Sequence, residues 1–170
     1  SQKLQKYAAS HHLPKDLSSE IGPHLAFHVR CGDYLSPALR SLHGATNRAF
    51  YLRAWNALRS EVGELPIAIF SDEPKVAKEI LGPKFNHGYF VPNAGKSTAL
   101  AWLMVMAQAK GMAIAPSSFG WWGAWTMNQI DPASPVVCPR PWFADASKND
   151  RDLLMPTWQT LGREYWEPIQ

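Results

Sequence analysis

The sequence predicts an α/β fold, in which a Rossmann-like parallel sheet is covered by helices on both faces. Short, continuously apolar runs alternate along the chain with segments of helical periodicity, an arrangement typical of parallel strands joined by helical crossovers. No apolar run reaches the ~18 residues that a membrane helix requires. A chain of 170 residues, 46% of them hydrophobic, is sufficient for one domain with a sizeable core, so two separately cored domains are not expected.

The order of elements follows from apolar runs, helical spacing and glycines. The expected strands are residues 24–30, 66–70, 89–91, 112–115 and 136–138. The expected helices are residues 46–62, 73–81, 97–110 and 119–128. Gly63, Gly82 and Gly111 follow three of these helices and predict where they end. Residues 140–170 are expected to be irregular, with one late helix near 157–161.

Two parts of the chain are distinguished by this pattern. Residues 1–23 do not follow the alternation of strands and helices. They are expected to be a connecting segment whose preceding part has been truncated. Residues 24–170 carry all the predicted strands and form the expected ligand-binding lobe. Internal repeats and low-complexity linkers are absent from the sequence.

Charge and cysteine content exclude several classes of protein. The net charge is +3 and the cationic residues are scattered, so a nucleic-acid-binding protein is not expected. Cys31 and Cys138 lie far apart without zinc-ligand spacing, which predicts neither a metal site nor a disulfide framework. Two reduced thiols are typical of a cytoplasmic protein. The cationic excess also suits an anionic small molecule, or peripheral contact with acidic headgroups at the inner face of a membrane.

Ligands of such sheets bind beyond the carboxyl ends of the strands, a rule that selects residues 30–34, 71–73 and 116–120. Arg30 leaves the first strand, and its planar guanidinium suits bidentate contact with phosphate oxygens or a surface ion pair. Asp33 could orient Arg30, act as a base or cap the turn. His28, inside the strand, is more typical of a core histidine than of a catalytic one.

The third strand end has the arrangement of an anion site. A strand is followed by Ser117, Ser118 and then a helix. This order directs free backbone N–H groups and the helix dipole at a ligand, although N-capping alone would require the same residues. Asp72 at the second strand end could cap a helix or face a sugar hydroxyl or a base edge. Eight Trp residues, four of them between 121 and 142, suit either a core or a surface that stacks on sugars.

Several catalytic motifs are missing. The sequence has no dinucleotide GxGxxG, no Walker loop, no HExxH and no GxSxG. Arginine and helix N–H groups can stabilise a leaving diphosphate without metal, so neither a metal nor a cofactor is expected.

Three blocks of sequence, taken together, resemble the bacterial α-1,2-fucosyltransferases of glycosyltransferase family 11. They are HVRCGDYL, FSDE and APSSFGWWGAW, followed by VVCPRPWF and LMPTW in the same order as in that family. The resemblance extends from about residue 24 to residue 160. It implies the C-terminal, donor-binding lobe of a two-lobed GT-B-like enzyme, without the N-terminal lobe that turnover requires.

The resemblance implies an inverting, metal-independent transfer of L-fucose from GDP-fucose to a galactoside, forming an α-1,2 linkage. Arg30 would hold the β-phosphate and, with Asp33 as base or proton relay, make up the catalytic residues. The residues implied in donor binding are His28, Arg30, Asp72, Ser117, Ser118, Phe119 and Gly120. The partners would be a GDP-sugar and a galactose-containing glycan.

The sequence departs from the family pattern at two of these blocks. Cys31 stands where the family has a second arginine, which removes one cation, and Pro116 stands where it has asparagine. Two alternatives are therefore kept. One is a transferase that uses another nucleotide sugar, and the other is a non-catalytic carbohydrate-binding module built on the Trp cluster.

Overall fold

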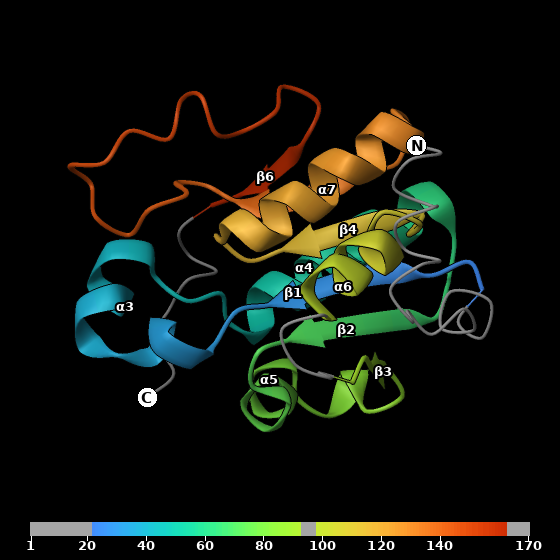
Figure 1. Ribbon diagram of the computed structural model, residues 1–170, viewed down its shortest axis with the longest axis horizontal. Coiled ribbons are helices and arrows are strands. Elements are labelled where there is room, and N and C mark those ends of the chain that lie inside the picture. The colour runs from blue at the N-terminus through green and yellow to red at the C-terminus, as the bar shows by residue number, and fades with distance from the viewer. Residues whose placement is uncertain (1–21, 93–97, 163–170) are drawn as a thin grey trace.

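The computed structural model describes residues 22–92 and 98–162, which form one parallel sheet between two layers of helices (Figure 1). The strands are β1 (Leu25–Val29), β2 (Ile67–Ser71), β3 (Tyr89–Phe90), β4 (Gly111–Ile114), β5 (Val136–Pro139) and β6 (Gln159–Leu161). They lie in the order β3-β2-β1-β4-β5-β6, and every neighbouring pair is parallel. The predicted α/β fold class is confirmed.

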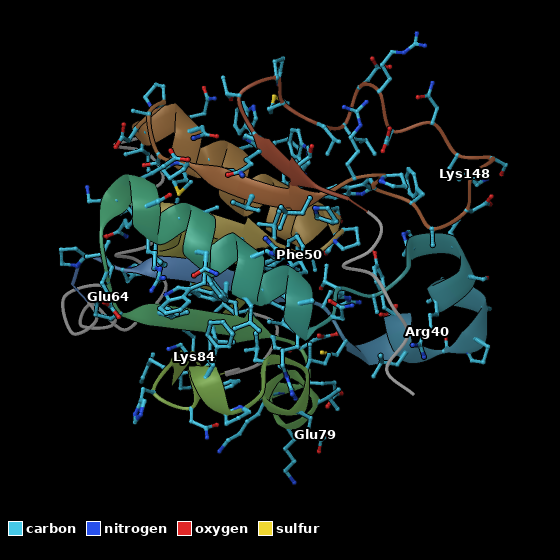
Figure 2. All side chains as sticks on the ribbon, turned by 180° about the vertical axis from the view of Figure 1, so that it is seen from behind. Arg40, Phe50, Glu64, Glu79, Lys84 and Lys148 are labelled. Atoms are coloured by element: carbon cyan, nitrogen blue, oxygen red, sulfur yellow. The ribbon has the colours of Figure 1, made fainter. Side chains whose placement is uncertain are left out.

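The helices divide between the two faces of the sheet. They are η1 (Gly32–Leu35), α3 (Pro37–His43), α4 (Arg48–Val62), α5 (Pro74–Leu81), η2 (Pro83–Phe85), α6 (Thr98–Met106) and α7 (Ser118–Ile130). Figure 1 shows α6 and α7 in front of the sheet, and Figure 2, seen from behind, shows α4 lying across the opposite face.

Each face has its own apolar core because side chains alternate along the strands. On β1, Leu25, Phe27 and Val29 pack with buried residues of α4 and α5. Ala26 lies on the other face, where it packs with residues of α6 and α7 such as Met106. Both cores are continuous apolar clusters, as expected for parallel strands buried on both sides.

The strand order places a topological switch point between β1 and β4. From β1 the chain adds β2 and β3 on one side, then returns to add β4, β5 and β6 on the other. In register, His28 of β1 lies opposite Ile114 of β4, so Arg30 and Pro116 leave the same edge of the sheet on neighbouring strands. In open α/β sheets this crevice is where ligands bind.

Two elements differ from the sequence-based expectation. The late helix near 157–161 was wrong: Gln159–Leu161 is the edge strand β6, which pairs in parallel with Val137–Pro139 of β5. The short helix α3 was not predicted, because none of its residues is buried and it therefore lacks an apolar face. The predicted connecting segment lies almost wholly outside the described residues, and its boundary at residue 23 stays a prediction.

Candidate functional site

Arg30 lies between two carboxylates at the carboxyl edge of the sheet. Its Nη2 donates to Asp33 Oδ1 at 2.5 Å, and its Nη1 lies 2.9 Å from Asp72 Oδ2. Asp72 directly follows β2, and its Oδ1 also accepts the backbone N–H of Cys31 at 3.0 Å. The structure therefore brings together two of the three predicted strand ends through one arginine and one aspartate.

The charges around Arg30 remain accessible. The side chains of Arg30, Asp33 and Asp72 are 30%, 55% and 26% exposed. Arg30 Nε is buried and has no hydrogen-bond partner among the described residues. An anion that binds here has to compete with Asp33, the more exposed carboxylate, while Asp72 keeps the guanidinium at the edge of the sheet. Charge-assisted contact with a phosphate is the chemistry that this arrangement allows.

Helix α7 begins directly beyond β4 and presents its first turn at the same edge. Ser117 is the N-cap, and its hydroxyl accepts the backbone N–H of Phe119 at 3.3 Å. The capping interpretation of Ser117 is therefore confirmed, whereas Ser118 is exposed and free to face a ligand. Helix N-termini bind anions through free N–H groups and the helix dipole.

His28 and Gly120 lie in the packing that holds α7 on the sheet. A Cβ at Gly120 would lie 2.7 Å from His28 Nδ1, and the Phe119 ring lies 5.7 Å from the imidazole, between centroids. His28 is 4% exposed, and burial lowers the pKa of its imidazole to about 3, with Arg30 adding to the shift. The neutral ring packs against Phe119 and Gly120 in the first turn of α7.

Cys31, which replaces the second arginine of the family pattern, faces away from the crevice. It is fully buried in the core formed with α4 and α5, and its Sγ lies 3.8 Å from Ser71 Oγ. Burial raises the pKa of the Cys31 thiol to about 12, so the group is neutral. A second cation at this position would therefore not point toward Arg30.

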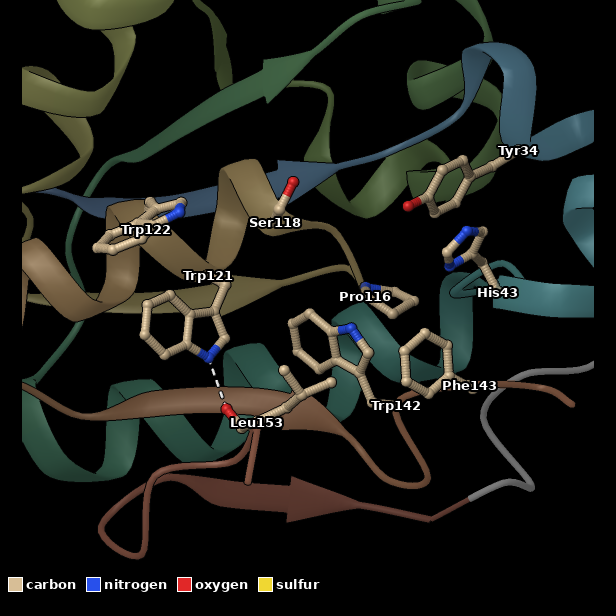
Figure 3. A pocket seen from close by; sticks show the side chains of 9 residues that line it. All are labelled: Tyr34, His43, Pro116, Ser118, Trp121, Trp122, Trp142, Phe143 and Leu153. Atoms are coloured by element: carbon tan, nitrogen blue, oxygen red, sulfur yellow. Dashed lines mark hydrogen bonds between the residues drawn. The ribbon is translucent and has the colours of Figure 1, made fainter. Parts of the chain in front are cut away.

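A cavity of about 410 Å³ opens beside the start of α7 (Figure 3). It is lined by Tyr34, His43, Pro116, Ser118, Trp121, Trp122, Trp142, Phe143 and Leu153. The rings of Tyr34 and His43 stack with centroids 4.5 Å apart, and the guanidinium of Arg30 lies 5.1 Å from the Tyr34 ring. Tyr34 lies in the predicted segment 30–34 but had no predicted role. His43 was not predicted, because it lies at the end of the unpredicted helix α3.

The described residues hold neither a metal-ligand cluster nor a membrane-spanning helix. In the ranges 22–92 and 98–162, no three His, Cys, Asp or Glu side chains come close enough to share a metal ion. Over the same part of the chain, every helix is too short or too polar to cross a bilayer. The expected cytoplasmic location and the peripheral membrane contact stay predictions.

A doubly wound sheet, with an arginine and a helix N-terminus at its switch point, defines an α/β domain of the Rossmann type. The chain matches the family described as Glycosyl transferase family 11 over residues 3–160, and it belongs to that family. It is 32% identical over 151 residues to the O-antigen biosynthesis glycosyltransferase WbnK of Escherichia coli, an alignment that covers 88% of this chain and 48% of WbnK.

A second Escherichia coli relative is named alpha-1,2-colitosyltransferase. It is 30% identical over 136 residues, which cover 79% of this chain and 46% of the relative. The chain thus spans about half the length of the relatives it matches. The family resemblance predicted from the sequence is confirmed.

Proposed function

We propose that this chain is the donor-binding lobe of an inverting glycosyltransferase that transfers L-fucose from GDP-fucose to a galactoside, forming an α-1,2 linkage. Membership of family 11 supports transfer of a sugar from a nucleotide donor to a glycan. The name of one relative also specifies an α-1,2 transfer. Residues 24–170 would bind the donor, and the acceptor glycan would meet it at the carboxyl edge of the sheet.

One observation carries the proposal: Arg30 and the first turn of α7 leave neighbouring strands at the topological switch point. A diphosphate placed there meets a guanidinium from one side and helix N–H groups from the other. Both groups neutralise the charge that develops on the leaving diphosphate, which is the largest electrostatic demand of the reaction. The transfer would need no divalent cation for this purpose.

The remaining donor residues have distinct parts in this arrangement. Ser118 and the backbone at Phe119 would donate to phosphate oxygens, while Ser117 caps the helix. Asp72 would fix Arg30 and lie near the nucleoside. Asp33 would orient Arg30, one of the roles that the sequence left open, through its 2.5 Å hydrogen bond. His28 and Gly120 would act indirectly by setting the position of α7.

A second candidate is a transferase that uses another nucleotide sugar. The relative named for colitosyl transfer supports it, because that protein is almost as similar to this chain as WbnK is. Thermal-shift measurements with GDP-fucose, other GDP-sugars and UDP-sugars separate the candidates, since at equal concentration a ligand that binds more tightly stabilises the folded state more. A carbohydrate-binding module is disfavoured by the family membership, and it predicts no response to GDP.

Calorimetry with GDP tests the donor site directly. Arg30→Ala is expected to weaken GDP binding by about tenfold to a hundredfold, as for the loss of a hydrogen bond to a charged group (~1.5–3 kcal/mol). Lys110→Ala is the matched control, because it removes the same charge at the amino end of β4, the opposite edge of the sheet. Absence of GDP binding, or equal affinities of both variants, contradicts the proposal.

A further inference from the structure

The cavity beside α7 adjoins the proposed donor site, and most of the residues that line it have no role in donor binding. Ser118 of α7 and His43 at the end of α3 both line it, on either side of Pro116 in Figure 3. A diphosphate bound at the start of α7 therefore leaves its sugar next to this cavity. The volume of about 410 Å³ lies within the ~300–1,000 Å³ of small-molecule sites.

The walls of the cavity are aromatic and held in place. The indole N–H of Trp121 donates to the carbonyl of Leu153 at 2.5 Å, and the backbone N–H of Trp142 donates to the Asp150 carboxylate at 2.7 Å. Fixed aromatic faces suit the apolar face of a ligand ring, while a few polar groups set its orientation. A pyranose combines such C–H faces with a rim of hydroxyl groups.

His43 supplies a polar group that can act on a hydroxyl. Its ring lies between Tyr34, 4.5 Å away, and Phe143, 5.9 Å away, between centroids. Its Nδ1 is buried and has no hydrogen-bond partner among the described residues. Burial lowers the pKa of His43, the Asp33 carboxylate opposes this shift and Arg30 adds to it. The imidazole is therefore neutral at pH 7, with one nitrogen able to accept a proton.

Further charged groups surround His43. Those nearest along the chain or in contact with its helix are Arg40, one turn earlier on α3, and Asp145, whose backbone N–H donates to the Leu42 carbonyl at 3.2 Å. The Asp145 carboxylate accepts the backbone N–H of Ser147 at 2.9 Å.

We propose that this cavity is the acceptor-sugar subsite and that His43 is the catalytic base, an inference that rests on the proposed function. The acceptor hydroxyl gives its proton to the free imidazole nitrogen of His43 as its oxygen bonds to the anomeric carbon of the donor. The bond from that carbon to the β-phosphate oxygen breaks, and its electron pair leaves with GDP. The imidazolium then releases the proton to water.

Asp33, the base suggested by the sequence, is less suited to this step. Its Oδ1 is engaged by Arg30 at 2.5 Å, and its carboxylate lies beside the guanidinium that would hold the leaving group. In an inverting reaction the base stands on the side of the anomeric carbon away from the leaving group. His43 is the better candidate, because its ring stacks on Tyr34 in the wall of the cavity and its Nδ1 has no hydrogen-bond partner among the described residues.

The test compares the wild-type protein with His43→Gln, which keeps a hydrogen-bonding side chain but cannot accept the proton. His87→Gln is the matched control, since His87 lies exposed in the turn after η2. Each protein is measured for GDP binding and for NMR shifts of its ¹⁵N-labelled imidazoles on adding methyl β-D-galactopyranoside with GDP present. Transfer from GDP-fucose is measured as a function of pH with the same substitutions in the whole enzyme of which this lobe is a part. His43→Phe, which keeps the ring stack, is a second variant.

The galactoside is expected to shift the His43 resonances of the wild type. Both His43 variants are expected to bind GDP normally and to transfer ~10²–10⁴-fold more slowly, without the loss of rate at low pH that the wild type shows. Unchanged transfer in His43→Gln, or His43 signals that respond to GDP-fucose but not to galactoside, overturns the inference while leaving the donor site intact. Failure of the wild type to bind GDP overturns the proposed function instead.

Discussion

The guanidinium of Arg30 lies 2.9 Å from the carboxylate of Asp72, and this pair joins the ends of the neighbouring strands β1 and β2. The second oxygen of Asp72 accepts the N–H of Cys31, so one carboxylate fixes both the side chain of Arg30 and the backbone beside it. Gly32, at φ +22°, lies against Asp72 where a Cβ would clash. Arg30 is therefore held at the edge before a ligand arrives, and binding costs less conformational entropy.

Asp33→Asn is expected to tighten GDP binding by up to about fivefold. The neutral amide no longer competes with the diphosphate for Arg30, and an exposed ion pair of this kind is worth only ~0.2–1 kcal/mol. Asp72→Asn is expected to have the opposite effect, because it keeps an oxygen for the Cys31 N–H but releases the guanidinium. Calorimetry measures both, and a change of the same sign in the two variants contradicts the division of roles.

Gly120→Ala is expected to destabilise the protein by ~1–3 kcal/mol and to weaken GDP binding, since the added methyl overpacks the contact between α7 and β1. The new Cβ would lie 2.7 Å from Nδ1 of the buried His28 ring, which cannot move aside. Urea unfolding gives the free energy of unfolding.

Gly123→Ala, on the same helix, is the control for Gly120→Ala. Its Cβ would meet the terminal methyl of Met106 at 2.7 Å, and a flexible thioether side chain can adjust. The expected cost is smaller, and GDP binding is expected to persist. Equal losses of GDP affinity in the two variants would show that the contact with His28 does not position the helix terminus.

The sequence was sufficient to predict five of the six strands and the edge of the sheet at which Arg30 and Asp72 lie. Parallel strands buried on both faces are continuously apolar, so β1, β2 and β4 are visible as runs, and the residues after each run necessarily share one edge. This reasoning located Arg30 and Asp72 together, without indicating their ion pair.

The rest of the site depends on packing that no local pattern records. The edge strand β6 is exposed over two of its three residues, so its sequence lacks the apolar signal of the central strands. The cavity combines Tyr34 and His43 with Trp142, which follows β5, and these residues meet only after the tail has folded back over α7. Their aromatic character was visible in the sequence, whereas their common location was not.

Both cysteines are expected to be unreactive in the folded protein. Cys31 is fully buried and so is Cys138, and burial raises the pKa of each thiol to about 12. Since the thiolate is the reactive form, a disulfide reagent at pH 8 should react slowly until the chain unfolds, and then modify two thiols per chain. Rapid modification of either thiol under native conditions would contradict the burial of that side chain.

The free energy of unfolding is expected to fall as the pH is lowered from about 6.5 towards 3, and His28 is expected to cause a large part of this loss. Burial lowers the pKa of His28 from 6.5 to about 3. Below pH 6.5 the unfolded chain therefore takes up a proton on this ring while the folded chain does not, which favours unfolding by up to ~1.4 kcal/mol per pH unit. Above pH 6.5 both states are neutral and the effect is absent.

His28→Leu removes this titration and places an apolar side chain in a buried site where Nδ1 has no partner among the described residues. Chemical denaturation at about pH 4.5, 5.5 and 7.5 samples the range over which His28 affects stability. The free energy of unfolding should fall less steeply with decreasing pH for His28→Leu than for the wild type. The exposed His87→Gln variant should follow the wild type. Parallel declines of all three proteins would mean that His28 is protonated in the folded state, and the buried, neutral imidazole beneath α7 would then be excluded.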